Sequence, residues 1–369
     1  MDPSTTILHG TRTITLDGEQ AGLRCPTDLL ERYDALQKNK YMGWTKHLRF
    51  RRLLGTGGQG VVFLSDRRGS DGFTLPVALK VFSPALFASH QSYDQAMERI
   101  AQVASCVAKI QHDNLLDVQN FTERHRIRIM EMEWVDGFDL EQLLAPAMLA
   151  RVEQRVSQRR WKHINEVIVT AGPIRSRLQP GIAVAIIRQC MAALAALHRE
   201  EIVHGDIKPS NIMVKRTGNP KIVDIGSALD LNNMPESRTC TPRYAAPEML
   251  ERSEFTPRSD LASLGYVLIE MLAGQPLFAG LKSLGELLDA KWTLPQRLDD
   301  ILPADVADSD LLMSICRRLI APDPMVRYES AEEANTSVGG FADFQRTLIF
   351  GDLASEYEND LRVWLEELD

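Results

Sequence analysis

The spacing of hydrophobic residues predicts short strands early in the chain and a long buried helix near its middle. Residues 61–64 and 77–81 are short, mostly apolar runs with several valines, which is typical of buried strands. Residues 181–197 form the longest apolar stretch and predict a buried helix. Because Arg188 and Gln189 interrupt this stretch, we expect it to be too short and too polar to span a membrane.

Polar residues suited to phosphoryl transfer follow that helix, within residues 204–211. This reaction depends on positioned charge and an in-line nucleophile more than on covalent chemistry. Asp206 would orient the attacking hydroxyl and accept its proton, and Lys208 would offset charge on the transferring phosphate. Asn211 and Asp224 supply the oxygen ligands that divalent metal ions prefer. Each fragment alone also occurs in ordinary turns, so the joint spacing carries the prediction.

A glycine-rich segment and a lysine-bearing strand precede these residues. Gly55, Gly57 and Gly60 fit the pattern G-x-G-x-x-G-x-V, in which backbone amides cover phosphate groups. The same glycines also occur in flexible hairpins and in dinucleotide-binding loops. A dinucleotide site needs a helix after the glycines, whereas residues 61–64 predict a strand, so we expect a hairpin. Lys80 lies 20 residues after Gly60, and its strand fits the motif V-A-I-K, whose lysine contacts nucleotide phosphates.

These segments, in this order, resemble the eukaryotic-type (Hanks-type) serine/threonine protein kinases, in particular their bacterial branch. The match extends from about residue 48 to about residue 341. Glu248, in Ala246-Pro247-Glu248, resembles the end of the activation segment and would form a buried ion pair with Arg327. Asp260 resembles the aspartate that holds the backbone of the catalytic loop. The resemblance implies an α+β fold with a small antiparallel β-rich N-lobe carrying helix C and a larger, mainly helical C-lobe.

The resemblance also implies an ATP site, with Mg²⁺ or alternatively Mn²⁺ at Asn211 and Asp224. The implied nucleotide-binding residues are the glycines Gly55, Gly57 and Gly60, the roof residues Val62 and Ala78, Lys80, the gatekeeper Met132, the hinge residues Glu133 and Val135, the ribose-binding Asp139 and the floor residue Met213. Met132 and Met213 are equally consistent with ordinary core packing, because an adenine pocket is an extension of the core.

A glutamate on helix C should pair with Lys80, and two counts along the chain disagree about its position. Glu98 lies 18 positions after Lys80, about where the family places this residue. Counting back from His112, which resembles the histidine after helix C, leads to Val103 instead. A longer helix over residues 95–108, or an insertion after Glu98, would reconcile the counts, so we expect Glu98 to be the partner. The alternatives are a missing ion pair and a Glu98 exposed on the helix surface.

The activation segment indicates which acceptor the protein uses. Lys208 and Thr241 fit the serine/threonine pattern, in which the threonine bonds both Asp206 and Lys208. The resemblance therefore implies an ATP-dependent kinase that acts on Ser or Thr hydroxyls of protein substrates, autophosphorylation included. The implied catalytic residues are Asp206, Lys208, Lys80, Glu98 and Thr241. The alternative is a pseudokinase or scaffold that binds nucleotide and partner proteins without turnover.

These assignments divide the chain into four regions. They are an N-terminal extension (1–44), the N-lobe (45–135), the C-lobe (136–345) with a basic, helix-like insertion at about 146–180, and an acidic helical tail (346–369). In the extension, apolar spacing after the cap residue Thr27 predicts an amphipathic helix that packs against the N-lobe, with Leu29, Leu30, Tyr33 and Leu36. The basic residues of the insertion predict a solvated helix face, the alternative being a patch that docks an acidic partner. The tail either packs as a terminal helix or binds a partner.

Composition agrees with a cytoplasmic protein. The 369 residues are 44% hydrophobic, enough to bury a two-lobed core. The net charge of −8 makes nucleic acid an unfavourable partner. The cysteines lack metal-site or redox-motif spacing, so we expect free thiols; they are Cys25, Cys106, Cys190, Cys240 and Cys316. No secretory signal and no membrane span are predicted.

Gly205 stands where most family members carry an arginine, and this predicts weak control by phosphorylation of the activation segment. In arginine-bearing kinases that arginine pairs with a phosphorylated residue of the segment. We expect activity to change little when a phosphatase removes phosphate from the intact protein, as measured by phosphate transfer before and after treatment. The residues concerned are Thr239, Thr241 and Ser237. A large loss of activity in protein that stays folded would indicate that Lys221 or Arg238 replaces the arginine.

Overall fold

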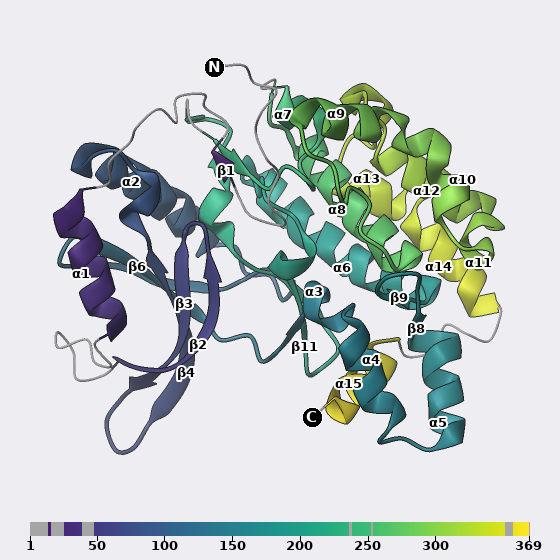
Figure 1. Ribbon diagram of the computed structural model, residues 1–369, viewed down its shortest axis with the longest axis horizontal. Coiled ribbons are helices and arrows are strands. Elements are labelled where there is room, and N and C mark those ends of the chain that lie inside the picture. The colour runs from purple at the N-terminus through teal and green to yellow at the C-terminus, as the bar shows by residue number, and fades with distance from the viewer. Residues whose placement is uncertain are drawn as a thin grey trace.

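The computed structural model has a β-rich lobe and a mainly helical lobe, the N-lobe and C-lobe of the sequence prediction (Figure 1). It describes residues 14–15, 26–38, 48–235, 238–251, 254–350 and 357–368. Cys25, Ser237 and, in the acidic tail, residues 351–356 and 369 lie outside the described residues.

The N-lobe contains a five-stranded antiparallel sheet with the strand order β2-β3-β4-β6-β5. Its strands are β2 (Leu48–Gly57), β3 (Gly60–Arg68), β4 (Thr74–Phe82), β5 (Val118–Arg124) and β6 (Ile127–Glu133). The central strand β4 is buried throughout residues 77–82, as its apolar run predicted. Gly57 and Gly60 are opposite each other across the β2–β3 turn, so the glycine-rich segment is a hairpin.

Helices α1 (Thr27–Lys38) and α2 (His90–Val107) pack on the N-lobe sheet. A capping box between Ser89 and Ser92 begins α2. The amphipathic spacing of α1 was predicted correctly, since its buried residues are Leu29, Tyr33 and Leu36. Its first turn is also fixed by Asp28, whose carboxylate lies 2.7 Å from the His90 ring. The α1 helix therefore fastens the N-terminal extension to the N-lobe.

Two long buried helices, α6 (Pro180–Arg199) and α8 (Pro257–Ala273), form the centre of the C-lobe. The other helices are α3 (Leu140–Leu143), α4 (Pro146–Glu153), α5 (Gln158–His163), α7 (Pro247–Leu250), α9 (Leu284–Thr293), α10 (Leu298–Ile301), α11 (Ala304–Ala307), α12 (Asp310–Leu319), α13 (Ala331–Thr336), α14 (Phe341–Phe350) and α15 (Tyr357–Glu367). The short strands are β7 (Gly137–Asp139), β8 (Val169–Ala171), β9 (Ser176–Leu178), β10 (Ile202–Val203), β11 (Ile212–Lys215), β12 (Pro220–Ile222), β13 (Leu229–Asp230) and β14 (Thr239–Cys240).

The α6 helix corrects one argument from the sequence. By length and composition it is apolar enough to cross a bilayer, so the expectation that it is too short and too polar was wrong. However, 72% of its most apolar stretch is buried inside the fold. Its packing against α8 and α13 therefore identifies α6 as a core helix.

The basic insertion is not one continuous helix. The α4 helix ends at Glu153, and Ser157 caps α5, whose first turn donates an N–H to the serine hydroxyl. A π-helical turn, η3 (Ile164–Ile168), then leads into the β8–β9 hairpin. The expectation of a helix-like insertion over about 146–180 therefore missed a break that a capping serine marks.

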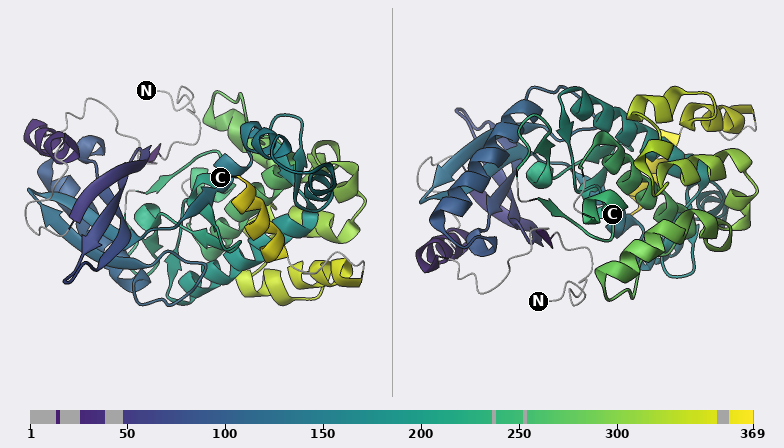
Figure 2. Two further views of the ribbon diagram at one scale, coloured as in Figure 1. Left: turned by 90° about the horizontal axis from the view of Figure 1, so that it is seen from below. Right: turned by 90° about the horizontal axis from the view of Figure 1, so that it is seen from above.

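The acidic tail is itself the partner of this basic insertion, and Figure 2 shows the C-terminal helix lying along the C-lobe. The α15 helix contacts α6 and η3 and buries Tyr357, Leu361, Trp364 and Leu365. Arg160 Nε donates to Glu367 Oε1 at 2.8 Å, and His163 lies 3.0 Å from Asp360. The tail is therefore a packed terminal helix, and its acidic residues pair with Arg160 and His163 of the insertion.

A buried ion pair joins α7 to the loop before α13, as the resemblance implied. Arg327 Nη1 and Nη2 donate to the Glu248 carboxylate at 2.6 and 2.8 Å. The Arg327 side chain is 0% exposed. Its nitrogens also donate to the backbone carbonyls of Ala321, Arg258 and Pro322. Each nitrogen of the guanidinium thus has an acceptor, the condition under which a buried charge is tolerated.

We predict that Arg327→Met lowers the free energy of unfolding by ~3–5 kcal/mol, because it leaves the Glu248 carboxylate buried without its counter-charge. Urea denaturation followed by circular dichroism measures the change. The matched control is Arg362→Met, which removes the exposed Arg362–Glu366 pair and should cost less than about 1 kcal/mol. Equal effects of the two substitutions would contradict the prediction.

Candidate active site

Asp260, near the start of α8, holds the backbone of the catalytic loop. Its carboxylate accepts hydrogen bonds from the N–H of His204 at 2.8 Å and of Gly205 at 2.9 Å. His198 Nε2 lies 2.9 Å from the same carboxylate. Because Asp260 is 1% exposed, water does not compete for these bonds, and they fix the loop that carries Asp206.

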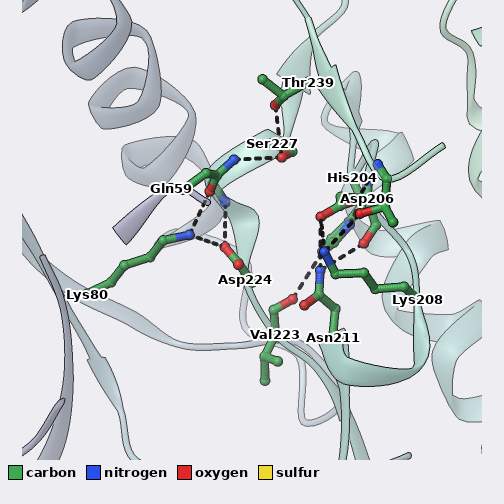
Figure 3. Close-up of polar contacts among 12 residues, drawn as sticks. Gln59, Lys80, His204, Asp206, Lys208, Asn211, Val223, Asp224, Ser227 and Thr239 are labelled. Atoms are coloured by element: carbon green, nitrogen blue, oxygen red, sulfur yellow. Dashed lines mark hydrogen bonds and ion pairs between the residues drawn. The ribbon is translucent and has the colours of Figure 1, made fainter. Parts of the chain in front are cut away.

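Asp206, Lys208 and Asn211 lie together on the catalytic loop (Figure 3). Lys208 Nζ donates to Asp206 Oδ2 at 2.7 Å and to Thr241 Oγ1 at 3.0 Å. The Thr241 N–H donates to Asp206 Oδ1 at 2.9 Å. Asn211 Nδ2 donates to the Asp206 backbone carbonyl at 2.8 Å. The activation segment is thus joined through Thr241 to both charged residues of the loop.

Asp224 follows β12, beside the catalytic loop. The Val223 N–H donates to the Asn211 carbonyl at 2.9 Å, so the two segments with predicted metal ligands are neighbours. The backbone of Asp224 has a φ of +65°, which is uncommon for a residue other than glycine. Mg²⁺ commonly takes one or two protein oxygens plus phosphate oxygens, and the Asn211 and Asp224 side chains suit that role.

Lys80 of β4 reaches across to the C-lobe. Its Nζ donates to Asp224 Oδ1 at 2.5 Å and to Gln59 Oε1 at 2.7 Å. Burial alone raises the pKa of Asp224, but Lys80, with smaller contributions from Lys208 and the Gly226 N–H, outweighs this and lowers the pKa to about 2. The Asp224 carboxylate is therefore ionised at neutral pH, the form that binds a cation.

Gln59, which the sequence analysis did not single out, links the glycine-rich hairpin to the activation segment (Figure 3). Besides accepting from Lys80, it donates from Nε2 to Ser227 Oγ at 2.8 Å. Thr239 Oγ1 donates to the same Ser227 oxygen at 3.0 Å. A Cβ on Gly226 would lie 2.1 Å from Gln59 Oε1, so this contact requires glycine there. The available signal in the sequence was a long polar side chain between glycines at a hairpin turn.

Glu98 does not pair with Lys80 in this structure. It is exposed on α2 and makes no ion pair or hydrogen bond with the described part of the chain. The helix is continuous from His90 to Val107, so its length accounts for the difference between the two counts. The expected Lys80–Glu98 contact is thus replaced by contacts of Lys80 with Asp224 and Gln59.

Strand register places the predicted roof of the nucleotide site on one face of the N-lobe sheet. Val62 is opposite Lys80, and Ala78 is opposite Met132. Cross-strand neighbours share a face, and so do residues two apart on one strand. All four side chains therefore point to the side of the sheet on which Lys80 meets Asp224.

The connection between the lobes supplies a backbone donor that suits adenine. Val135 is 7% exposed, and its N–H makes no hydrogen bond within the part of the chain that the structure describes. A buried N–H without a partner is costly, so it suits a ligand acceptor. The neighbouring Glu133 N–H already donates to the Asp117 carbonyl at 3.0 Å. On the C-lobe side, Met213 is opposite Asp139 in the β11–β7 pair.

The three glycines of the hairpin differ in what requires them. Gly60 has a φ of +147°, and a Cβ there would lie 2.0 Å from the Val81 carbonyl, so packing excludes any side chain. A Cβ at Gly55 or Gly57 would meet nothing within 4 Å. These two positions border open space, which is compatible with close approach of a phosphate group to the backbone.

Gly205 also occupies a position that favours glycine. Its φ is +72°, and a Cβ there would lie 3.0 Å from the Ser227 carbonyl. Of the two cations that were considered as replacements for the missing arginine, Lys221 is 4% exposed and pairs with Glu133. Arg238 is part of the activation segment itself, and its guanidinium lies 4.9 Å from the centre of the Phe255 ring. Arg238 is therefore the better placed of the two.

Comparisons with known proteins agree with this geometry. The family model of the protein kinase domain matches residues 48–337. The serine/threonine-protein kinase PrkC of Bacillus subtilis (strain 168) is 27% identical over 302 residues, which cover 80% of this chain and 40% of PrkC. The probable serine/threonine-protein kinase PknB of Lactococcus lactis subsp. lactis (strain IL1403) is 26% identical over 299 residues, which cover 79% and 42%. The chain thus spans about two fifths of the length of these relatives.

Among solved structures, the kinase domain of PknI from Mycobacterium tuberculosis aligns with a TM-score of 0.53. The alignment covers 82% of this chain and 95% of that domain, at 22% identity. At this identity the likeness concerns the fold, and the predicted two-lobed protein kinase fold is confirmed.

We predict that Asp139→Asn removes a pH-dependent loss of stability. Burial raises the pKa of Asp139 from 3.8 to about 6, although the Gln142 N–H, which Asp139 caps at 2.8 Å, opposes the shift. Because the pKa of Asp139 is higher in the folded chain than in the unfolded chain, ionisation of this carboxyl destabilises the fold. The free energy of unfolding therefore falls progressively as pH rises from about 4 to about 6. Asparagine caps helices equally well and does not titrate.

Denaturation with urea from pH 4.5 to 7.5 measures the effect. The difference in the free energy of unfolding between the variant and the unsubstituted chain should grow by about 1–3 kcal/mol as pH rises to about 6. Above about pH 6 it should stay constant. A difference between the two chains that is independent of pH would contradict a raised pKa.

Proposed function

Because the chain belongs to the protein kinase family, we propose that it transfers the γ-phosphoryl group of ATP to serine or threonine hydroxyls of proteins. The observation that carries this proposal is the cluster in which Lys208 bonds Thr241 and Asp206. In this cluster Asp206 is a potential base and Lys208 a cation, and both are in contact with Thr241 of the activation segment. Kinases of this family generally use ATP and Mg²⁺, and the relatives' names specify serine and threonine.

In the proposed mechanism, Asp206 receives the proton of the acceptor hydroxyl, and Lys208 offsets negative charge beside it. Asn211 and Asp224 would hold the metal ion. When bound, Mg²⁺·ATP supplies the phosphoryl group and neutralises charge on the phosphates. Thr241 keeps the activation segment against the loop through bonds of 2.9 and 3.0 Å, so an acceptor chain on this segment would be aligned with Asp206.

The proposed nucleotide site uses both lobes. The free, buried Val135 N–H supports adenine binding at the connection, and Val62 and Ala78 would cover the base from the N-lobe. Met132 and Met213 would complete the apolar walls. The Asp139 carboxylate, largely ionised at neutral pH, is available to the ribose.

The contacts of Lys80 describe a resting arrangement of this site. Lys80 is held by Gln59 and Asp224, whereas phosphoryl transfer by the family requires it at the phosphates and paired with a helix C glutamate. Nucleotide binding would therefore require Lys80 to leave Asp224 so that the carboxylate can meet the metal. Glu98 would join Lys80 after a rotation of α2.

The second candidate is a pseudokinase that binds nucleotide or partners without turnover, and exposure of Glu98 is the observation that favours it. The complete set of Lys80, Asp206, Asn211 and Asp224 favours the enzyme.

We retain the division at residues 45–135 and 136–345 as the proposed lobes of the catalytic unit. The cytoplasmic location stays a prediction.

We predict that Asp206→Asn reduces phosphate transfer by at least about 100-fold, because it removes the base but keeps an oxygen for the Thr241 N–H. Incubation with Mg²⁺ and radiolabelled ATP, followed by mass spectrometry of modified residues, measures transfer and identifies the acceptor. The matched control is Asp299→Asn on α10, where the carboxylate pairs with Arg317 on the surface.

The control should retain full activity, with phosphate on Ser and Thr. Equal transfer by the Asp206 variant and the unsubstituted chain would mean that another route produces the signal. No transfer by either chain, with nucleotide binding intact, would favour the pseudokinase.

A further inference from the structure

A short strand of the N-terminal extension pairs with the activation segment. Strand β1 (Ile14–Thr15) runs antiparallel to β14, with Ile14 opposite Cys240 and Thr15 opposite Thr239. The two strands form a sheet of their own, so β14 has no other strand partner within the described residues. Figure 1 shows β1 between the lobes, at the activation segment.

The position of this ladder relative to the phosphotransfer cluster gives it significance. Cys240 is followed directly by Thr241, which bonds Asp206 and Lys208. The described ladder therefore ends one residue before the threonine that joins the activation segment to the catalytic loop.

We propose that the segment around Ile14–Thr15 occupies the protein-substrate site and competes with substrate by adding a strand to β14. The inference rests on the proposed function, since it assumes that substrates bind along the activation segment. An extended chain that binds a strand edge uses main-chain hydrogen bonds, which any polypeptide can offer. A protein substrate that pairs with β14 must therefore displace β1.

The sequence of the segment suits this role. Threonines at 11, 13 and 15 alternate with Arg12, Ile14 and Leu16, an alternation with high strand propensity. A ladder of two residues is weak on its own, but here it is tethered. The α1 helix is anchored to the N-lobe, and the 11 residues between Thr15 and Thr27 span at most ~40 Å. Such a tether gives an effective concentration of the order of millimolar, so weak pairing suffices.

The same pairing also bears on Lys80. Thr239, in the strand that β1 covers, donates to Ser227, which accepts from Gln59, the partner of Lys80. Docking of β1 thus favours the arrangement in which Lys80 is bonded to Gln59 and Asp224. A substrate that displaced β1 would also favour release of Lys80 from these partners.

Three chains and one peptide test this proposal. They are the full chain, a chain that starts at residue 21 and keeps α1, a double variant Ile14→Pro and Thr15→Pro, and a fluorescent peptide of residues 8–22. Proline removes the backbone donors and so breaks the ladder. The double substitution Ile14→Val and Thr15→Ser is the matched control. Fluorescence anisotropy measures peptide binding, and steady-state kinetics with dephosphorylated casein measure substrate competition.

We expect the peptide to bind the truncated chain and the proline variant at least about tenfold more tightly than the full chain or the control. The KM for casein should fall about three- to tenfold in the same two chains, with the KM for ATP unchanged. Equal peptide binding by all chains, or a KM for casein that rises on truncation, would overturn the inference. Preferential peptide binding without phosphate transfer by any chain would refute the proposed function and leave the docking intact.

Discussion

The ion pair between Lys80 and Asp224 connects the N-lobe sheet to the catalytic side of the C-lobe, and the other contacts of the site extend from it. The Gln59 side chain of the glycine-rich hairpin is among the contacts of Lys80, so the ion pair and the hairpin are linked. Gln59 accepts from Lys80 and donates to Ser227, which in turn accepts from Thr239. A single chain of polar contacts thereby reaches from the nucleotide side to the strand that pairs with β1. Any group that draws Lys80 away from Asp224 must rearrange this chain.

The C-lobe half of the site has a different physical character. Asp260 bonds two consecutive backbone N–H groups of the catalytic loop from a buried position, and Arg327 neutralises Glu248 at the end of the activation segment. Both are satisfied networks shielded from water, which resist rearrangement. The loop with Asp206 is thus rigid, whereas Lys80 and the hairpin are held by contacts that a ligand can replace. If Asp206 is the base, as proposed, its fixed position and the exchangeable contacts of Lys80 would suit a site that closes on a nucleotide.

The parts of the fold and site that the sequence predicted are those encoded by local spacing. Asp206, Lys208 and Asn211 lie within a few residues of one another, and the hairpin of Gly57 and Gly60 follows from its flanking strand. The partner of Lys80 was predicted wrongly for this state, because helix position depends on packing that a residue count does not contain. The contacts of Gln59 with Ser227, of β1 with β14 and of α15 with the insertion join residues far apart in sequence. Each requires the assembled fold, so no local pattern announces it.

If the proposed function holds, the Lys80–Asp224 pair is the resting form of the phosphotransfer site. A crystal structure of the full chain with Mg²⁺ and a non-hydrolysable ATP analogue tests this most directly. We expect Asp224 and Asn211 to contact the metal, the Val135 N–H to contact adenine, and Lys80 Nζ to have moved from Asp224 to the phosphates. A nucleotide bound while Lys80 remains 2.5 Å from Asp224, as here, with no metal at that carboxylate, would contradict the claim.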